Sequence, residues 1–154
     1  MTKIFLVRHG QDADNAAGIL NGRRDTELTE LGRTQARQVA EKLKDNGIQI
    51  IYTSPLKRAY ETARIIATAL SIDEVVADGH LVERDFGVLA GKLVTDIARY
   101  TDKILPTDGV NYFLEAKGAE NFPALYERGK KIIEEIRARH RGQPRSPSVF
   151  HPEP

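Results

Sequence analysis

The sequence predicts a three-layer α/β/α domain with a mostly parallel sheet. Short apolar runs alternate with amphipathic segments of helical period, which is the pattern of strands joined by crossover helices. The first run, at residues 4–7, has four consecutive apolar residues between polar ones and is typical of a strand buried on both faces. At 154 residues, the chain is long enough for one hydrophobic core and too short to suggest two.

Thr29 and Gly47 mark the two ends of the first predicted helix. Thr accepts hydrogen bonds from the first amides of a helix, and Gly adopts the left-handed conformation that often ends one. The apolar residues between them recur at helical spacing: Ala36, Val39, Ala40 and Leu43. A second strand is expected after this helix, because residues 48–52 contain three isoleucines and a tyrosine.

Ser54 and Pro55 open the second predicted helix, with Ser as its cap and Pro at the first helical position, where the missing amide hydrogen is harmless. Its apolar face comprises Leu56, Ala59, Ala63, Ile66, Ala67 and Leu70. A short third strand is predicted at residues 74–77, and a last helix at 122–137 follows a long polar excursion. The predicted buried side of that helix comprises Leu125, Tyr126, Ile132, Ile133 and Ile136.

Composition favours a single domain with no bias toward a nucleic acid or a membrane. The 23 basic and 22 acidic residues leave a formal charge of +1, so any anion selectivity must be local. The absence of Cys excludes disulfides and thiol catalysis and is typical of a cytoplasmic protein, which is the location we expect. No run is apolar enough for a membrane helix or a secretory signal.

The most distinctive local feature is Arg8-His9-Gly10, directly after the first predicted strand. Ligands of open α/β sheets bind beyond the carboxyl ends of the strands, so an arginine and a histidine at that point suit an anionic ligand. The tripeptide alone is a weak signal, because a lone His after a strand is more often a satisfied surface residue. Its interpretation therefore depends on the rest of the sequence.

Further blocks supply that context. They are Gln11 with Asn15, Gly22-Arg23-Arg24-Asp25, Leu28-Thr29-Glu30-Leu31-Gly32, residues 54–63 and residues 81–87. In this order, and from Lys3 to about Arg139, the chain resembles the histidine phosphatase superfamily. Its members have a phosphoglycerate mutase-like fold and carry phosphoryl groups on an active-site histidine. The blocks specify the family far better than they specify a substrate.

The resemblance implies a role for each of four catalytic candidates. His9 would be the nucleophile, attacking as a neutral imidazole through one ring nitrogen while a backbone carbonyl holds the other. Arg8 and Arg58 would clamp the phosphate, because a guanidinium can donate two hydrogen bonds to it. Glu83 would give a proton to the leaving alcohol, with its pKa raised by apolar neighbours.

Gln11 and Asn15 complete the predicted substrate-binding set with Arg8 and Arg58. By the resemblance, Asn15 contacts the transferred phosphoryl group, and Gln11 occupies a variable position beside it. No metal or other cofactor is implied, because the four histidines show no ligand spacing and family members rely on arginines for positive charge.

These inferences predict a metal-independent phosphatase that hydrolyses a small phosphorylated metabolite through a phosphohistidine on His9. A phosphoglycerate mutase-type phosphotransferase is the enzymatic alternative, and a catalytically impaired phosphate-binding remnant is an alternative of another class. The metabolite is the expected partner; nucleic acid and membrane are not, and the sequence leaves a homodimer open. Residues 83–120 would set specificity if their apolar side chains form a wall of the site, whereas simple packing onto the core is the plainer expectation.

The end of the chain departs from the family pattern, in which an apolar strand and a second histidine follow the last helix. Residues 142–154 instead contain four of the seven prolines. We therefore divide the chain into a domain at 1–141 and a Pro-rich tail at 142–154. Either the tail contains a shortened strand at 148–151, with His151 as the second histidine, or the core strand is lost and activity is weakened. We favour the loss, because Pro cannot donate to a central ladder.

Overall fold

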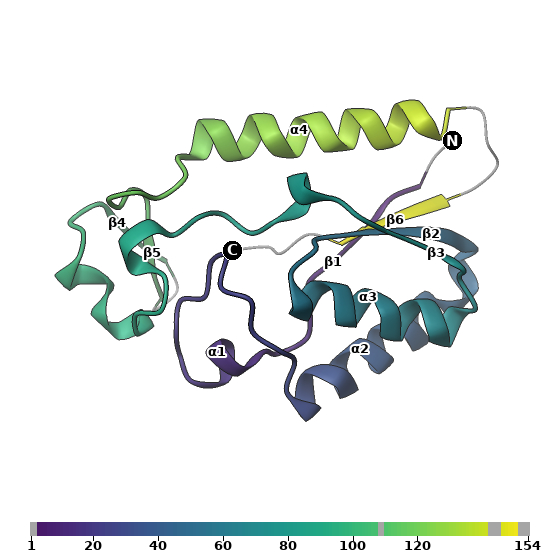
Figure 1. Cartoon of the computed structure of the whole chain (residues 1–154), viewed down its shortest axis with the longest axis horizontal. Coiled ribbons are helices and arrows are strands. Elements are labelled where there is room, and N and C mark those ends of the chain that lie inside the picture. Colours follow the sequence, from purple (N-terminus) through teal and green to yellow (C-terminus); the bar gives the residue numbers. More distant parts are fainter. Residues whose placement is uncertain (1–2, 108–109, 142–145, 151–154) are drawn as a thin grey trace.

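A four-stranded parallel sheet with helices on both faces forms the centre of the molecule. Helices α2 (Glu30–Leu43) and α3 (Lys57–Leu70) pack side by side on one face of the sheet, and α4 (Phe122–Arg139) covers the other (Figure 1). The predicted α/β/α architecture with a mostly parallel sheet is confirmed. The computed structural model describes residues 3–107, 110–141 and 146–150.

The strands follow the order β1-β6-β2-β3 across the sheet, and every neighbouring pair is parallel. Their carboxyl ends therefore lie along one edge, which is where Arg8 and His9 follow β1. The strands at 48–52 and 74–77 were predicted within a residue of their ends. The bounds of the four strands are Phe5–Val7 for β1, Ile48–Thr53 for β2, Glu74–Ala77 for β3 and Ser146–Phe150 for β6.

Strand β6 overturns the expectation that the chain has lost a core strand at its end. It lies in the middle of the sheet and pairs with both β1 and β2. Pro147 pairs with Ile50 in this strand, and the register shifts between Ile48 and Ile50. Such an irregularity accommodates a proline, which has no amide hydrogen for the ladder. His151, the candidate second histidine, lies outside the described residues, and the domain boundary at 141 stays a prediction.

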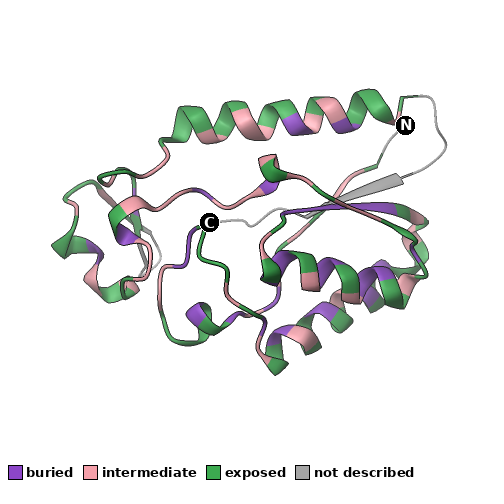
Figure 2. Ribbon diagram, viewed as in Figure 1, coloured by how far each residue is buried: buried purple, intermediate pink, exposed green. Residues whose placement is uncertain are grey.

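The first strand is buried on one face only, contrary to the prediction. Phe5 and Val7 pack against the apolar cluster between the sheet and helices α2 and α3. Leu6 points to the opposite face, where 58% of its surface is exposed. The cluster under α4 includes Ile50 and Tyr52 of β2, and β1 is the outer strand of the described sheet. Most of β2 is buried (Figure 2). A run of apolar residues could not reveal which strand would lie at the edge.

Thr29 caps α2 as predicted, because its hydroxyl accepts a hydrogen bond from the Gly32 amide at 3.1 Å. The helix passes into the 3₁₀ turn η1 (Lys44–Asn46) and ends at Gly47, which has a φ of +62°. Ala36, Ala40 and Leu43 are buried, so the predicted apolar face is correct for these three residues. Local signals were sufficient for this helix.

Helix α3 begins later than predicted and has a different cap. Its first residue is Lys57, whose amide donates to the Asp25 carboxylate at 2.7 Å. Ser54 instead accepts a hydrogen bond from the Leu56 amide at 3.3 Å, and Pro55 precedes the helix. The residue that binds the helix end comes from a loop far away in the sequence, which local capping rules do not consider.

Helix α4 is buried at Ile132 and Ile136, as predicted, but Tyr126 is 67% exposed. Tyr126 lies near the start of the helix, which extends past the ends of the strands in Figure 1. The predicted side of the helix is therefore correct only where the sheet lies beneath it. Among the described residues, no helix has the length and apolar character needed to cross a membrane.

The stretch between β3 and α4 forms a small apolar cluster of its own, centred on Leu89, Ile97 and Phe113. It contains an antiparallel pair, β4 (Ile104–Thr107) and β5 (Val110–Phe113), that the sequence did not predict. Phe113 is buried, as expected if the apolar side chains of this stretch pack onto the core, whereas Tyr100 and Tyr112 are exposed. The remaining short helical segments are α1 (Ala13–Ala16), η2 (Gly79–Leu81), η3 (Gly87–Leu89) and η4 (Val94–Arg99).

Candidate active site

His9 lies two residues after the end of β1, and the backbone of the next residue holds its ring. The Nδ1 atom lies 2.7 Å from the carbonyl oxygen of Gly10. Because a carbonyl oxygen only accepts, Nδ1 of the neutral ring carries the hydrogen and Nε2 carries the lone pair. This is the arrangement that the sequence argument expected, with a backbone carbonyl on one ring nitrogen and the lone pair on the other.

Two glycines allow the chain to present His9 in this way. A methyl group on Gly10 would lie 2.2 Å from the carbonyl oxygen of Gly32, and one on Gly32 would lie 2.1 Å from that of Gln11. The end of β1 therefore packs backbone to backbone against the start of α2. On its other side, the Gly10 amide donates to Thr62 Oγ1 at 3.2 Å, which ties the same turn to α3.

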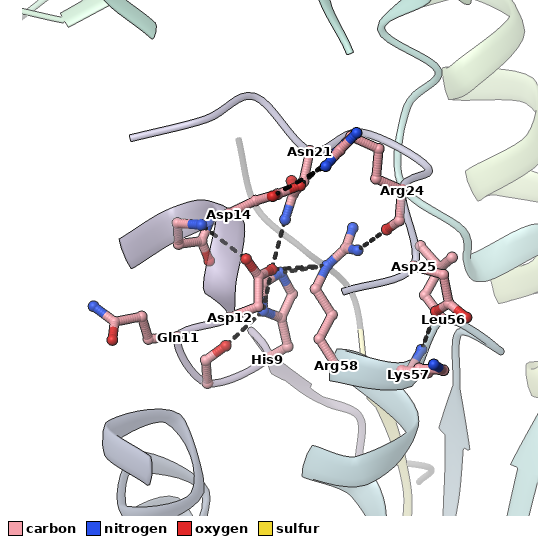
Figure 3. A network of polar contacts seen from close by, with 12 residues as sticks. His9, Gln11, Asp12, Asp14, Asn21, Arg24, Asp25, Leu56, Lys57 and Arg58 are labelled. Atoms are coloured by element: carbon pink, nitrogen blue, oxygen red, sulfur yellow. Dashed lines mark hydrogen bonds and ion pairs between the residues drawn. The ribbon is translucent and has the colours of Figure 1, made fainter. Parts of the chain in front are cut away.

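Arg58 is the second residue of α3, and only 1% of it is exposed. Its two terminal nitrogens donate to the carbonyl oxygens of Gly22 and Arg24, both at 2.7 Å. Its Nε donates to His9 Nε2 at 3.2 Å (Figure 3). Each terminal nitrogen has a second hydrogen. The structure thus places Arg58 against the predicted nucleophile, while its role as a phosphate clamp stays a prediction.

Asp12 completes this cluster, although the sequence analysis did not single it out. Its carboxylate is fully buried and lies 3.3 Å from Arg58 Nε and 4.0 Å from His9 Nδ1. It accepts hydrogen bonds from the Asn15 amide at 2.8 Å, as the N-cap of α1, and from the Asn21 side chain (Figure 3). The Asp at an N-cap position after the histidine could have predicted the cap, but nothing local indicated the contact with Arg58.

Burial of the ring lowers the pKa of His9 from its usual value of 6.5, because the charged imidazolium is poorly solvated there. The charge of Arg58 also lowers the pKa of His9, whereas the hydrogen bond to Gly10 and the charge of Asp12 raise it. Burial likewise lowers the pKa of Arg58, and Asp12 is the strongest of the charges that oppose that change. The lowered pKa of His9 favours the neutral ring near neutral pH.

A pocket of about 520 Å³ opens beside His9. Three of the four predicted substrate-binding residues line it: Arg8, Gln11 and Asn15. Gln11 is fixed through its side-chain oxygen, which accepts from the Thr29 hydroxyl at 2.9 Å. The apolar part of the lining comprises Ile19, Ala36, Val39 and Val94. The pocket therefore combines polar groups near the histidine with an apolar wall, and Arg58 meets His9 from outside this lining.

Glu83 lies on the stretch that follows η2, near Arg58. It is half-buried, and its Oε1 accepts a hydrogen bond from the Arg84 amide at 2.6 Å. Its charge is close enough to raise the pKa of Arg58 against the effect of burial. The Arg23 side chain donates to the Glu83 carbonyl at 3.2 Å. The structure brings Glu83 toward the guanidinium beside His9, and its role as proton donor stays a prediction.

The other two described histidines have partners of their own. His80 lies 2.9 Å from the Asp78 carboxylate, and His140 lies 3.0 Å from the Tyr52 hydroxyl. Within residues 3–107, 110–141 and 146–150, no three His, Asp or Glu side chains are grouped so that they could hold a metal ion. The described site therefore combines His9 with two arginines, Arg8 and Arg58, and two carboxyl groups, those of Asp12 and Glu83.

Comparison with known proteins places this site in a family. The family described as histidine phosphatase superfamily (branch 1) matches residues 4–151. The chain belongs to this superfamily. Phosphoserine phosphatase 1 of Hydrogenobacter thermophilus is 35% identical to this superfamily member over 144 residues, which are 93% of the chain and 68% of that protein. The metal-independent phosphoserine phosphatase of Arabidopsis thaliana is 34% identical over 146 residues, 93% of the chain and 61% of that protein.

A solved structure of mycobacterial glucosyl-3-phosphoglycerate phosphatase, in complex with VO3, has the same fold. It superimposes with a TM-score of 0.80 at 27% sequence identity, over 99% of this superfamily member and 75% of the mycobacterial chain. Our chain therefore spans roughly three fifths to three quarters of the length of these relatives. The fold and the family are shared over that span.

Proposed function

We propose that the chain is a metal-independent phosphatase that hydrolyses a small phosphorylated metabolite through a phosphohistidine on His9. The state of the His9 ring carries this proposal: Nδ1 is held by the Gly10 carbonyl at 2.7 Å, so the neutral ring presents Nε2. The Nε of Arg58 lies 3.2 Å from that nitrogen. A cation next to a neutral nucleophile suits an anionic electrophile such as a phosphate monoester, whose own charge repels other nucleophiles.

In the first step, the Nε2 lone pair of His9 forms a bond to phosphorus while the bond from phosphorus to the ester oxygen breaks. Arg8 and Arg58 bind the phosphoryl oxygens and stabilise the charge that builds on them. Glu83 gives its proton to the leaving oxygen, which departs as an alcohol. Gln11 and Asn15, which line the pocket beside His9, hold the phosphoryl group.

In the second step, water attacks phosphorus and the phosphorus–nitrogen bond breaks. The bonding electrons return to Nε2 of His9, and the Glu83 carboxylate takes a proton from the attacking water. Inorganic phosphate leaves, and both residues regain their starting protonation states. The cycle needs no metal because the guanidinium groups supply the positive charge.

The names of the relatives support a phosphatase and suggest where to look for a substrate. Two of them are named as phosphoserine phosphatases, one of these as metal-independent, and a third as a glucosyl-3-phosphoglycerate phosphatase. All three names describe removal of phosphate from a small metabolite. Phosphoserine is therefore the first natural substrate to test.

The proposal is tested by hydrolysis of p-nitrophenyl phosphate and phosphoserine in the presence of EDTA. We expect the purified chain to release phosphate and His9→Ala to fall to background, because no other described residue presents a histidine nitrogen at this site. His80→Ala is the matched control: it removes a histidine that is bound to Asp78, and it should keep the activity. Loss of activity in His151→Ala would assign that residue as the second histidine.

The rival functions give different results in the same set of assays. Interconversion of 2- and 3-phosphoglycerate with little release of phosphate would replace the phosphatase by a mutase-type phosphotransferase. A cooperatively folded chain that binds phosphate but turns over none of these substrates would be a binding module. Activity that EDTA abolishes would contradict the metal-independent mechanism.

A further inference from the structure

Asp12 is a fully buried carboxylate at a site proposed to bind an anion, and the mechanism above leaves it without a task. A negative charge at this position repels a phosphoryl group, so its presence there calls for a physical reason. Its contacts supply one. Among the described residues, the groups that the carboxylate meets at hydrogen-bond distance are all donors: the Asn15 amide, the Asn21 side-chain amide and Arg58 Nε.

The Nε of Arg58 has one hydrogen and two acceptors within reach. It donates that hydrogen to His9 Nε2 at 3.2 Å, and Asp12 Oδ2 lies 3.3 Å from the same nitrogen. The acceptor on His9 is the lone pair that forms the bond to phosphorus. Once that bond exists, Nε2 can no longer accept, and the buried Arg58 N–H needs another acceptor.

We propose that Asp12 is a positioning residue that takes over the Arg58 Nε–H when His9 Nε2 bonds to phosphorus. The inference rests on the proposed function. No proton is transferred in this exchange: the N–H of Arg58 turns from one acceptor to another 3.3 Å away, while the terminal nitrogens stay bound to the carbonyls of Gly22 and Arg24. Arg58 therefore keeps its place through the whole cycle, and its hydrogen bond does not compete with the attack.

A carboxylate fits this position, whereas the isosteric amide does not. With Asn at position 12, one of its two terminal atoms becomes an NH₂ group, which faces either Arg58 Nε and the Asn21 amide or the Asn15 amide. Each orientation sets donor against donor. Asn is nevertheless among the best N-cap residues, so the variant Asp12→Asn is expected to keep the start of α1.

The matched control is Asp14→Asn, which removes a second buried carboxylate, at the second position of the helix that Asp12 caps. Asp14 pairs with Arg24 Nε at 2.7 Å, and it makes no hydrogen bond or ion pair with His9 or Arg58 in the described contacts. A general effect of lost charge or of a perturbed helix would appear in both variants. An effect on the exchange at Arg58 would appear in Asp12→Asn alone.

The kinetic readout separates positioning from simple structural damage. For Asp12→Asn, we expect kcat with p-nitrophenyl phosphate to fall by about tenfold or more, because the Arg58 N–H loses its charged acceptor in the phosphorylated state. Inorganic phosphate should inhibit more strongly than in the wild type, because a repelling charge has been removed. A structural defect would weaken both turnover and phosphate binding. Equal kcat in wild type and Asp12→Asn, or equal losses in Asp12→Asn and Asp14→Asn, would overturn the inference.

A second readout needs no turnover. Orthovanadate takes the place of the phosphoryl group on a histidine nitrogen, and the Arg58 Nε–H can be followed by its NMR signal. We expect this signal to persist in the wild type when vanadate binds and to exchange rapidly with solvent in Asp12→Asn. Loss of the signal in the wild type on vanadate binding contradicts the exchange. An inactive chain that shows the expected signals would refute the phosphatase and retain the role of Asp12, and a chain that does not bind vanadate would refute both.

Discussion

Arg58 and Arg84 are both buried and both donate hydrogen bonds to backbone carbonyls, yet their surroundings differ in one respect. All three nitrogens of Arg84 donate to carbonyl oxygens, of Glu120 at 2.8 Å, of Phe113 at 3.0 Å and of Leu114 at 2.7 Å. Arg58 uses only its two terminal nitrogens in this way. Its Nε is left for the ring of His9 and the nearby carboxylate.

This difference indicates what each arginine does. The rings of Phe113 and Phe122 lie 4.4 and 4.2 Å from the guanidinium carbon of Arg84, so that this side chain joins β5 to the start of α4. The contacts of Arg84 are therefore structural, whereas Arg58 has a donor at the ring nitrogen of His9. Burial of an arginine does not by itself identify a functional site. What distinguishes the two arginines is the acceptor of Nε, which is the ring of His9 for Arg58 and a backbone carbonyl for Arg84.

The largest effect that would separate the two arginines is on catalysis. In Arg58→Lys, the charge stays but the planar fork is lost, and we expect kcat/KM to fall by about 10²- to 10³-fold. The measurement is phosphatase activity per folded molecule, with folding checked by urea denaturation. A variant that retained wild-type kcat/KM would place Arg58 in the same structural class as Arg84.

A lysine in place of Arg84 should change stability rather than catalysis. Arg84→Lys leaves carbonyls of the loop and of β5 without donors and removes the stacking on two rings, so we expect the free energy of unfolding to fall by about 2–4 kcal/mol. Activity per folded molecule should stay close to that of the wild type, because Arg84 makes no direct contact with His9. A large loss of kcat at unchanged stability would reverse the distinction between the two residues.

Sequence reasoning succeeded where the information is local. The helix that Thr29 caps and Gly47 ends, and the strand at 74–77, follow from periodicity and from residues at the element ends themselves. It failed where contacts with a distant segment determine the local structure. Asp25 binds the first amide of α3 from another part of the chain, and the exposure of Leu6 depends on which strand lies at the edge.

The tail shows the limit of a rule about one residue. Proline disfavours a central strand, yet Pro147 lies in β6 because the sheet between β1 and β2 requires a strand and a register shift accommodates the ring. The candidate site shows the converse limit. His9 and Arg58 were predicted from their blocks and lie together, whereas Asp12 was missed because its burial and its partner across the fold leave no mark in the local sequence.

The smallest expected effect is on the pKa of His9. It tests whether the charge of Arg58, and not that of Arg84, acts on this ring. Only neutral His9 can attack, and protonation at low pH removes the lone pair. Because burial lowers the pKa of His9 below 6.5, activity should persist to a lower pH than an exposed histidine would allow. The charge of Arg58 contributes to that lowering, so Arg58→Gln should raise the pKa of His9. Arg84→Gln should leave it unchanged.

The histidine ring signals in NMR spectra measure this pKa directly, at a temperature where both variants are folded. A pKa of His9 above 6.5 in the wild type would mean that the contacts to Gly10 and Asp12 outweigh burial, and that the acid limb of kcat/KM lies near neutral pH instead. An equal shift in the two variants would mean that the electrostatic field at His9 is set by the overall charge of the molecule. A shift in Arg58→Gln alone would tie the state of the nucleophile to the one buried arginine whose Nε meets its ring.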